Sequence, residues 1–285
     1  MKTLGYYNGE IAELDELKIP FMDRAGYFGD GVYDATYSRN HIIYNLDAHV
    51  DRFYRSAELL RMTVPMDKEA CKDLLRELVK KVDDGEQFVY WQITRGTGPR
   101  NHVFPAGDAN FWVMLRPNKI RDLRTPVRAI TVEDDRFLLC HIKTINLLPA
   151  VMASQKALEA GCEEAIFHRG DRVTECAHSN VSILKNGTFI TAPLDNLILP
   201  GTARRKILTM CDRLGIPTEE RPYTLSELFD ADEIIITSAG TFCLPLCELD
   251  GRPVGGKDPK NLEALKQLLL EDFVTETGGG SFSFD

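Results

Sequence analysis

Short turn signals between β-rich runs are the feature of this sequence that most limits its fold. The dipeptides Asn8-Gly9, Gly170-Asp171, Asn186-Gly187 and Asp250-Gly251 each separate two such runs. Asn, Asp and Gly tolerate the positive φ of tight hairpin turns, so each dipeptide predicts two antiparallel strands joined directly. Helical patterns are interspersed with these hairpins. The sequence therefore predicts an α+β or mixed α/β fold rather than a doubly wound parallel sheet.

Hydrophobic spacing places further helices and strands between the hairpins. We expect one helix capped by Asp47 and a second that follows Asp67 and ends at Asp84-Gly85. Other helices are expected over residues 148–160, 203–214 and 259–274, and strands over 42–44, 88–94, 111–115, 127–132 and 233–238.

The chain length allows one large domain or two smaller ones, because 285 residues is about twice a typical domain. The segment 117–126 is polar and rich in Arg, with Pro at both ends, and is the best candidate linker. We therefore expect a small N-terminal α/β domain over residues 1–119 and a larger C-terminal domain over residues 120–285. Its last residues, about 277–285, are expected to be a flexible tail.

Charge and motif content exclude several classes of partner. With 34 Lys plus Arg against 43 Asp plus Glu, the net charge of −9 disfavours nucleic acids and anionic membranes. We expect no membrane span, since no apolar stretch approaches the ~20 residues that a span needs, and no signal peptide, since the first 14 residues contain no apolar core region. Seven scattered cysteines without a C-x-x-C pair are typical of a cytoplasmic protein. No metal site is expected, because His and Cys lack metal-ligand spacing.

One lysine is isolated among apolar residues. Lys143 is the only Lys, Arg, Asp or Glu between Arg136 and Lys156. An amine that loses its hydration is favoured in the neutral, nucleophilic form that Schiff-base chemistry needs. On composition alone, however, the commoner role of such a lysine is to cover apolar surface with its stem while its ammonium reaches water.

Three other constellations could carry chemistry. Arg100 and His102 lie two residues apart, so in an extended segment they project to one side and could hold a carboxylate. Glu175, which precedes small polar residues, could be a positioned carboxylate. The small-residue turns at 199–204 and 237–241 could hold phosphate with backbone N–H groups. Each pattern alone is more often a solvated loop or hairpin end.

Taken together and in this order, these segments resemble the class IV, or fold-type IV, pyridoxal-phosphate aminotransferases. Among them, the sequence is most similar to the D-amino acid aminotransferases. The resemblance covers about residues 5–254 and is carried by segments 23–33, 49–56, 94–102, 142–148 and 174–180. It implies two domains with the cofactor between them, and it favours Lys143 as a catalytic residue.

The resemblance also implies a role for each candidate residue. Lys143 corresponds to the Schiff-base lysine that also moves the substrate Cα proton, Glu175 to the carboxylate facing the pyridine nitrogen, and Arg52 to the phosphate-binding arginine. Tyr33, Arg100 and His102 correspond to the trio that holds the substrate α-carboxylate, with the Arg and His supplied by the second subunit of a homodimer. The other implied cofactor-binding positions are Ser179, Asn180, Thr202, Ala203, Ser238 and Ala239.

The implied reaction is ping-pong transfer of an amino group from a D-amino acid, such as D-alanine or D-glutamate, to 2-oxoglutarate or pyruvate. Pyridoxal 5′-phosphate would cycle through pyridoxamine 5′-phosphate. Two departures from the family predict a weaker hold on the cofactor phosphate. In the first turn the Thr hydroxyl is missing at Ala203 or shifted by one residue to Thr202, and in the second turn Ala239 stands where the D-specific enzymes carry Thr. The alternatives are an L-branched-chain aminotransferase, an aminodeoxychorismate-lyase-like enzyme or a non-catalytic binding protein. The Arg100 and His102 pair with Tyr33 favours the D-specific enzyme.

Overall fold

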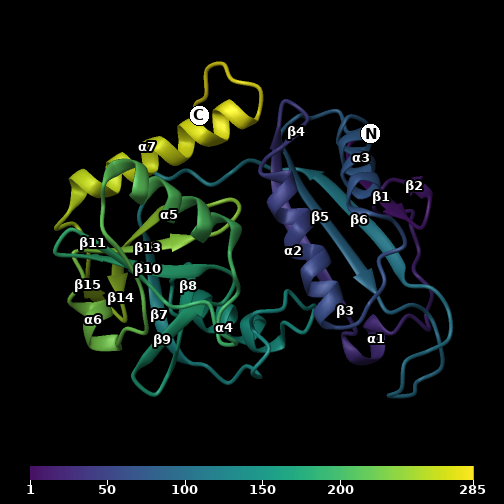
Figure 1. Cartoon of the computed structure of the whole chain (residues 1–285), viewed down its shortest axis with the longest axis horizontal. Helices are drawn as coiled ribbons and strands as arrows, with labels where there is room; N and C mark the ends of the chain where they lie inside the picture. The colour runs from purple at the N-terminus through teal and green to yellow at the C-terminus, as the bar shows by residue number, and fades with distance from the viewer. Residues whose placement is uncertain (285) are drawn as a thin grey trace. The chain divides into compact units, whose positions relative to one another are not determined.

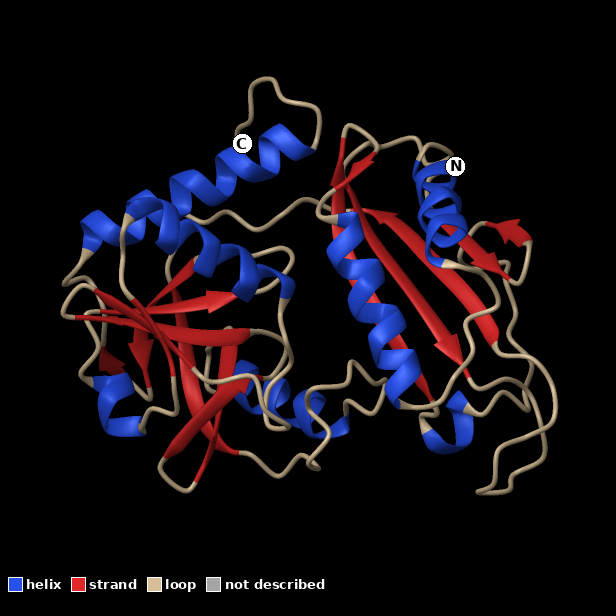
Figure 2. Ribbon diagram, viewed as in Figure 1, coloured by secondary structure: helices blue, strands red, loops and turns tan. Residues whose placement is uncertain are grey.

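The computed structural model describes residues 1–284, which form two compact units (Figures 1 and 2). Unit 1 comprises Met1–Ile120, Ile142–Asn146 and Phe273–Phe282. Unit 2 comprises Arg121–His141, Leu147–Asp272 and residues 283 and 284. Both units combine helices with a sheet, which confirms the α+β or mixed α/β class. Residue 285, the last of the expected tail, lies outside the described residues.

Unit 1 is built on a six-stranded antiparallel sheet in the order β2-β1-β6-β5-β3-β4. Helix α2 packs against one face of the sheet (Figure 2), where Val50 and Phe53 join Trp91 in a buried core. The elements of unit 1 are β1 (Leu4–Tyr7), β2 (Glu10–Ala12), α1 (Ala25–Phe28), β3 (Gly31–Arg39), β4 (Ile42–Ile43), α2 (Leu46–Leu59), α3 (Lys68–Val79), β5 (Gln87–Thr94) and β6 (Asn110–Pro117).

Two expected helix ends in unit 1 are wrong. Asp47 does not cap α2, because Asn45 precedes the helix with φ of 53° and Asp47 lies in the first turn. There its charge still favours the helix dipole. Asp67 does cap α3, accepting a hydrogen bond from the backbone N–H of Ala70 at 2.8 Å. That helix ends at Val79, before the expected Asp84-Gly85. The expected end was too late because Val82 continues the apolar pattern of the helix, although it is buried from the loop that follows.

Unit 2 is built on a nine-stranded mixed sheet in the order β12-β11-β10-β13-β14-β7-β8-β9, with β15 paired to β14. Three strand pairs are parallel, and the hairpins expected at 170–171, 186–187 and 250–251 are all present. The elements are β7 (Val127–Glu133), α4 (Leu148–Glu159), β8 (Glu164–Arg169), β9 (Arg172–Cys176), β10 (Asn180–Lys185), β11 (Thr188–Thr191), α5 (Thr202–Leu214), β12 (Thr218–Glu220), α6 (Leu225–Phe229), β13 (Glu233–Thr237), β14 (Leu244–Leu249), β15 (Arg252–Pro253) and α7 (Pro259–Glu276), whose last residues belong to unit 1.

The segment that carries Lys143 groups with unit 1, not with the C-terminal part of the chain as expected. Strand β4 pairs only with the end of β3, so the first residues of β3 have an open edge. The segment Ile142–Asn146 fills this edge: the N–H of Tyr33 donates to the carbonyl of Lys143 at 3.0 Å, and the N–H of Ile145 donates to Gly31 at 3.1 Å. Lys143 is therefore fixed to β3 through its own backbone.

The segment expected to link two domains and the start of the expected tail both make defined contacts. Within the segment 117–126, Leu123 is buried, and the N–H of Arg121 donates to the carbonyl of Gly240 at 2.9 Å. In unit 1, the guanidinium of Arg39 donates to the carbonyls of Gly279 and Ser281 at 2.9 and 2.8 Å. Among residues 1–284, no helix combines the length and apolarity needed to cross a bilayer.

Candidate active site

A buried acid and two basic side chains form the centre of unit 1. Residues alternate faces along β3, so Tyr33 and its neighbour Asp34 point to opposite sides, and Asp34 faces α2 with no exposed surface. Its carboxylate accepts from Nε and Nη2 of Arg52, at 2.8 and 2.7 Å, and pairs with Nδ1 of His49 at 2.7 Å. His49 and Arg52 lie three residues apart on α2, and one carboxylate holds both.

Burial and charge act in opposite directions on this group. Burial alone would raise the pKa of Asp34, but the Arg52 guanidinium and His49 outweigh it and hold the pKa well below its ordinary value of 3.8. For His49, burial is the larger effect and lowers the pKa despite the neighbouring carboxylate. His49 is therefore neutral at pH 7, with an Nδ1–H that donates to Asp34. Arg52, the expected phosphate ligand, is oriented by its two bonds to the same carboxylate.

Unit 1 also brings Lys143, Tyr33 and α2 together. The Nζ atom of Lys143 lies 4.3 Å from the centre of the Tyr33 ring, which in turn stacks on Tyr90 at 5.2 Å. The backbone N–H of Lys143 donates to the hydroxyl of Ser56 at 3.2 Å. Ser56 lies one turn after Arg52 on the same helix, so the predicted lysine and the predicted phosphate ligand share one region of unit 1.

The structure brings Arg100 and His102 together, but not beside Tyr33. Both side chains are exposed on the loop that joins β5 to β6. The guanidinium carbon of Arg100 lies 5.4 Å from the centre of the Phe28 ring, and the His102 ring lies 5.1 Å from it. Among residues 1–284, no hydrogen bond or ring contact joins either side chain to Tyr33, whose ring neighbours are Tyr90 and Lys143.

Glu175 is the central carboxylate of unit 2. It is buried at the end of β9, where its Oε2 accepts from the Asn180 side chain at 3.0 Å and from the Leu199 N–H at 2.9 Å. Its Oε1 accepts from Nη1 of Arg136. Arg136 also donates to the carboxylate of Asp134 through Nε and Nη2. Burial alone would raise the pKa of Asp134, but the Arg136 guanidinium keeps this pKa below its ordinary value. The carboxylate of Glu175 is thus fixed in orientation from both sides.

The two small-residue turns of unit 2 lie next to regular elements. Helix α5 begins directly after Gly201, with Thr202 and Ala203 buried in its first turn. A Cβ at Gly201 would come within 2.0 Å of the Asn180 Oδ1 atom, so any other residue would require the Asn180 amide to move. The second turn follows β13, where the hydroxyls of Ser238 and Thr241 hydrogen bond at 2.9 Å next to the half-buried Ala239. Ser179 is buried and donates to Glu164 at 3.0 Å.

Comparisons with known proteins identify the family. The family model described as amino-transferase class IV matches residues 31–249. That match covers most of the chain. The chain belongs to the class IV aminotransferase family.

Relatives and solved structures agree with this assignment. The chain is 37% identical to a D-alanine aminotransferase of Listeria monocytogenes, covering 99% of this chain and 100% of the relative. It is also 37% identical to a D-alanine aminotransferase of Bacillus licheniformis, covering 96% and 97%. Among solved structures, the branched-chain amino acid aminotransferase of Escherichia coli has a TM-score of 0.88 at 21% identity, covering 97% and 96%. The branched-chain aminotransferase of Thermoproteus uzoniensis with norvaline has a TM-score of 0.86 at 23% identity, covering 95% and 97%.

Sequence reasoning missed several polar residues that organise the site of this class IV aminotransferase. Asp34 could have been found, because an acid at an inward position of a β-rich run must have a buried partner. His49 and Arg52, which lie three residues apart and so on one face of a predicted helix, were the candidate partners for this acid. Arg136 gave none, because it follows three acidic residues and reads as part of a solvated charged run. Among residues 1–284, no group of three His, Cys, Asp or Glu side chains could hold a metal ion.

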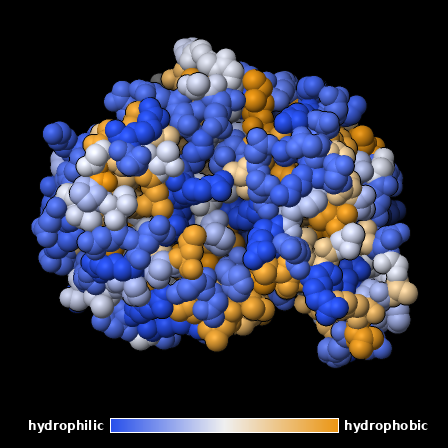
Figure 3. All heavy atoms as spheres, in the orientation of Figure 1, coloured by the Kyte–Doolittle hydropathy of each residue, from blue (hydrophilic) through white to orange (hydrophobic). Residues whose placement is uncertain are grey.

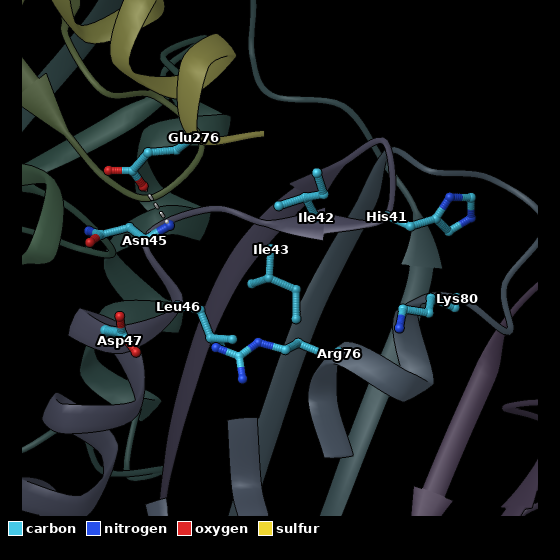
Figure 4. Close-up of a pocket in the computed structure, with 9 residues that line it drawn as sticks. All are labelled: His41, Ile42, Ile43, Asn45, Leu46, Asp47, Arg76, Lys80 and Glu276. Atoms are coloured by element: carbon cyan, nitrogen blue, oxygen red, sulfur yellow. Dashed lines mark hydrogen bonds between the residues drawn. The ribbon is translucent and has the colours of Figure 1, made fainter. Parts of the chain in front are cut away.

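A pocket elsewhere in unit 1 of this aminotransferase contains none of the predicted site residues (Figure 4). It has a volume of about 490 Å³ and lies at the start of α2. The Arg and the Lys that line this pocket already form ion pairs with acidic residues: Arg76 pairs with Asp73, and Lys80 pairs with Glu77. We assign it no role. The lining residues are His41, Ile42, Ile43, Asn45, Leu46, Asp47, Arg76, Lys80 and Glu276.

Proposed function

We propose that this protein is a D-amino acid transaminase that uses pyridoxal 5′-phosphate and returns it through pyridoxamine 5′-phosphate. The observation that carries the proposal is 37% identity to D-alanine aminotransferases over nearly the full length of both chains. The D-type pair Arg100 and His102, together with Tyr33, supports it. The proposed substrates are D-alanine or D-glutamate with 2-oxoglutarate or pyruvate.

The side chains present fit the proposed cofactor. A phosphorylated pyridine aldehyde needs an amine to bond it, an anion for its ring nitrogen and donors for its phosphate. Unit 1 offers the amine of Lys143 and the oriented guanidinium of Arg52. Unit 2 offers the fixed carboxylate of Glu175 and the first turn of α5, which contains no acidic residue. We further assign cofactor contacts to Ser179, Asn180, Thr202, Ala203, Ser238 and Ala239.

Each proposed role follows from the chemistry of the side chain. When bound, the cofactor supplies an electron sink that acidifies the substrate Cα–H. Lys143 Nζ would act as the general base that takes the proton from the substrate Cα and, once protonated, as the general acid that gives it back in the second proton transfer. Glu175 keeps the ring nitrogen protonated by its negative charge. Arg100, His102 and Tyr33 bind the α-carboxylate, and their placement selects the D-configuration.

A stereochemical assay tests the proposed function. With added cofactor and 2-oxoglutarate, we expect turnover of D-alanine and at least about a hundredfold lower kcat/KM for L-leucine, because a carboxylate trap placed for one enantiomer misplaces the Cα–H of the other. Activity with L-leucine alone would favour the branched-chain alternative, and sustained release of pyruvate from aminodeoxychorismate, beyond one equivalent per site and without an amino acceptor, would favour a lyase. An Arg100→Ala variant should raise the KM for D-alanine, whereas the exposed Arg124→Ala should not.

We also propose that the enzyme is a homodimer, in which Arg100 and His102 serve the site of the partner subunit. Helix α4 supports this, because its apolar residues recur at helical spacing on an exposed face. Leu148, Val151, Met152 and Leu158 are between 53% and 71% exposed. Apolar surface is visible in Figure 3 in the region where Figure 1 labels α4. Monomeric proteins rarely leave such a stripe uncovered.

The oligomeric state can be checked with one charge on α4. Met152→Glu should shift the protein from dimer to monomer in analytical ultracentrifugation, because a carboxylate would be buried at the interface without a partner. Ser154→Glu, also exposed on α4 but outside the apolar stripe, is the matched control and should remain dimeric. A Met152→Glu protein with unchanged sedimentation would contradict the assignment of this face.

We place the enzyme in the cytoplasm, since all seven cysteines are free thiols.

A further inference from the structure

The loop that carries Arg100 and His102 is anchored at both ends by one buried acid. Asp23, 3% exposed, accepts from the Thr94 hydroxyl at 2.8 Å and from the Asn110 side chain at 2.7 Å. Thr94 is the last residue of β5 and Asn110 the first of β6, so Asp23 joins the two ends of the loop. The ends of this Gly- and Pro-rich loop are therefore fixed, which leaves the position of its middle to be explained.

The middle of the loop is held by the residue that follows Asp23. Nη1 of Arg24 donates to the backbone carbonyl of Asn101 at 2.6 Å. Asn101 separates Arg100 from His102, so this bond acts on the peptide unit that sets the spacing of the two side chains. The N–H of Asn101 donates to the Pro99 carbonyl at 2.7 Å, which forms a tight local turn at the same point.

The guanidinium of Arg24 is itself fixed. Its side chain is only 4% exposed, and its Nε donates to the Asp30 carboxylate at 2.8 Å. Asp30 also accepts from Nε of Arg95 at 3.0 Å, and Arg95 donates onward to the carbonyl of Leu60 at 2.9 Å. A buried guanidinium without partners would be costly, so this shared carboxylate keeps Arg24 in one orientation.

The aromatic ring of Phe28 packs against the guanidinium of Arg24. The guanidinium carbon of Arg24 lies 4.7 Å from the centre of the Phe28 ring. Arg100 and His102 contact the same ring, at 5.4 and 5.1 Å. Phe28 is thus a common contact surface for all three side chains, and cation–π attraction favours the positions of the two guanidinium groups. Because Arg24 precedes α1 and Phe28 ends it, one helical turn presents both supports.

We infer that Arg24 is a positioning residue for the substrate carboxylate: through the Asn101 carbonyl, and with Phe28 as a shared support, it sets the placement of Arg100 and His102. The inference rests on the proposed function, in which that pair binds the α-carboxylate. Arg24 touches neither substrate nor cofactor in this assignment. It acts by preorganising two groups that would otherwise have to be ordered each time a carboxylate binds.

The test uses the holoenzyme and four variants. Arg24→Lys keeps a cation for Asp30 but has no planar fork that could donate to Asp30 and Asn101 together. Arg61→Lys is the matched control, since Arg61 is an exposed arginine beside the same loop, over the Phe104 ring, with no bond to Asn101. Arg100→Ala and the double variant Arg24→Lys/Arg100→Ala complete a cycle. The measured quantities are kcat and KM for D-alanine, and the Kd of propionate, a carboxylate without an amine.

For Arg24→Lys we expect a KM for D-alanine and a Kd for propionate raised about tenfold or more, with a smaller change in kcat. Arg61→Lys should resemble the wild type. In the Arg100→Ala background, the effect of Arg24→Lys should shrink severalfold, because the group that it positions is gone. A general loss of structure would give the same fold-change in both backgrounds and would lower the melting temperature, which overturns the inference.

The outcomes separate this inference from the function on which it rests. If Arg100→Ala leaves KM and propionate binding unchanged, the carboxylate assignment fails, and the positioning role fails with it. If Arg100→Ala weakens both while Arg24→Lys changes neither, the function stands and the positioning role is wrong. Should Arg24→Lys be insoluble, Phe28→Leu takes its place in the same cycle, because it removes the shared ring while leaving Arg24 bonded to Asp30 and Asn101. It too should raise KM less in the Arg100→Ala background, and equal effects in both backgrounds would overturn the role of this support.

Discussion

Lys143→Ala should abolish transamination, lowering kcat by roughly 10⁴-fold or more. A single amine serves as covalent anchor and as the base that moves the Cα proton, and its loss removes both contributions. The structure supports a local effect, because the backbone of Lys143 bonds to Tyr33 and Ser56 through atoms that alanine also has. The measurement is the initial rate with D-alanine and 2-oxoglutarate at saturating cofactor.

A second readout makes this prediction independent of activity. Borohydride reduction of the wild-type holoenzyme should leave the cofactor on the peptide that contains Lys143, as measured by mass spectrometry. The Lys143→Ala protein should carry no such modification. Lys119→Ala, an exposed lysine of the same unit, is the matched control and should keep full activity. A modified peptide from elsewhere in the chain, or an active Lys143→Ala enzyme, would contradict the assignment.

The isolation of Lys143 among apolar residues is a local signal that marked it as a candidate, and the resemblance to the class IV family then favoured it as the proposed catalytic lysine. The hairpin turns are also predictable from a short stretch of sequence, because two residues determine the backbone of each turn. The unit that holds Lys143 was not predictable. It depends on an open edge at the start of β3, and that edge exists only because β4 is two residues long. Local pattern predicts elements well but says little about which distant segment completes a sheet edge.

The supports of the site were the least predictable part. Arg24 and Asn101 are separated by 77 residues, and Arg136 and Glu175 by 39, so no periodicity connects them. Each contact pairs a buried guanidinium with an acceptor that the fold alone brings close. From sequence, a loop such as 95–110 reads as mobile because of its Gly and Pro residues, whereas Asp23 and Arg24 hold its ends and its middle.

Asp34→Ala should produce the largest loss of stability, about 3–5 kcal/mol in the free energy of unfolding. It removes the acceptor that Arg52 and His49 share, and removing the acidic member of a mostly buried ion pair is strongly destabilising. The same change releases Arg52 from its orientation, so the Kd for the cofactor should rise together with the loss of stability. Urea denaturation and cofactor titration measure the two effects. Asp51→Ala is the matched control, because Asp51 lies on the same helix in an exposed pair with Lys68 and should cost at most about 1 kcal/mol.

The pH dependence distinguishes the charge of Asp34 from mere packing. Because the folded-state pKa of Asp34 lies below its ordinary value of 3.8, the stability that it contributes is present above pH 3.8 and is lost only as the pH falls through the lower folded value. The difference between wild type and Asp34→Ala should therefore be nearly the same at pH 7 and pH 5. A difference that already shrinks between these two values would mean that the carboxyl titrates in its usual range and is not held by Arg52. Asp34→Asn tests the same point, since it keeps the shape and one acceptor but not the charge, and it should recover less than half of the loss.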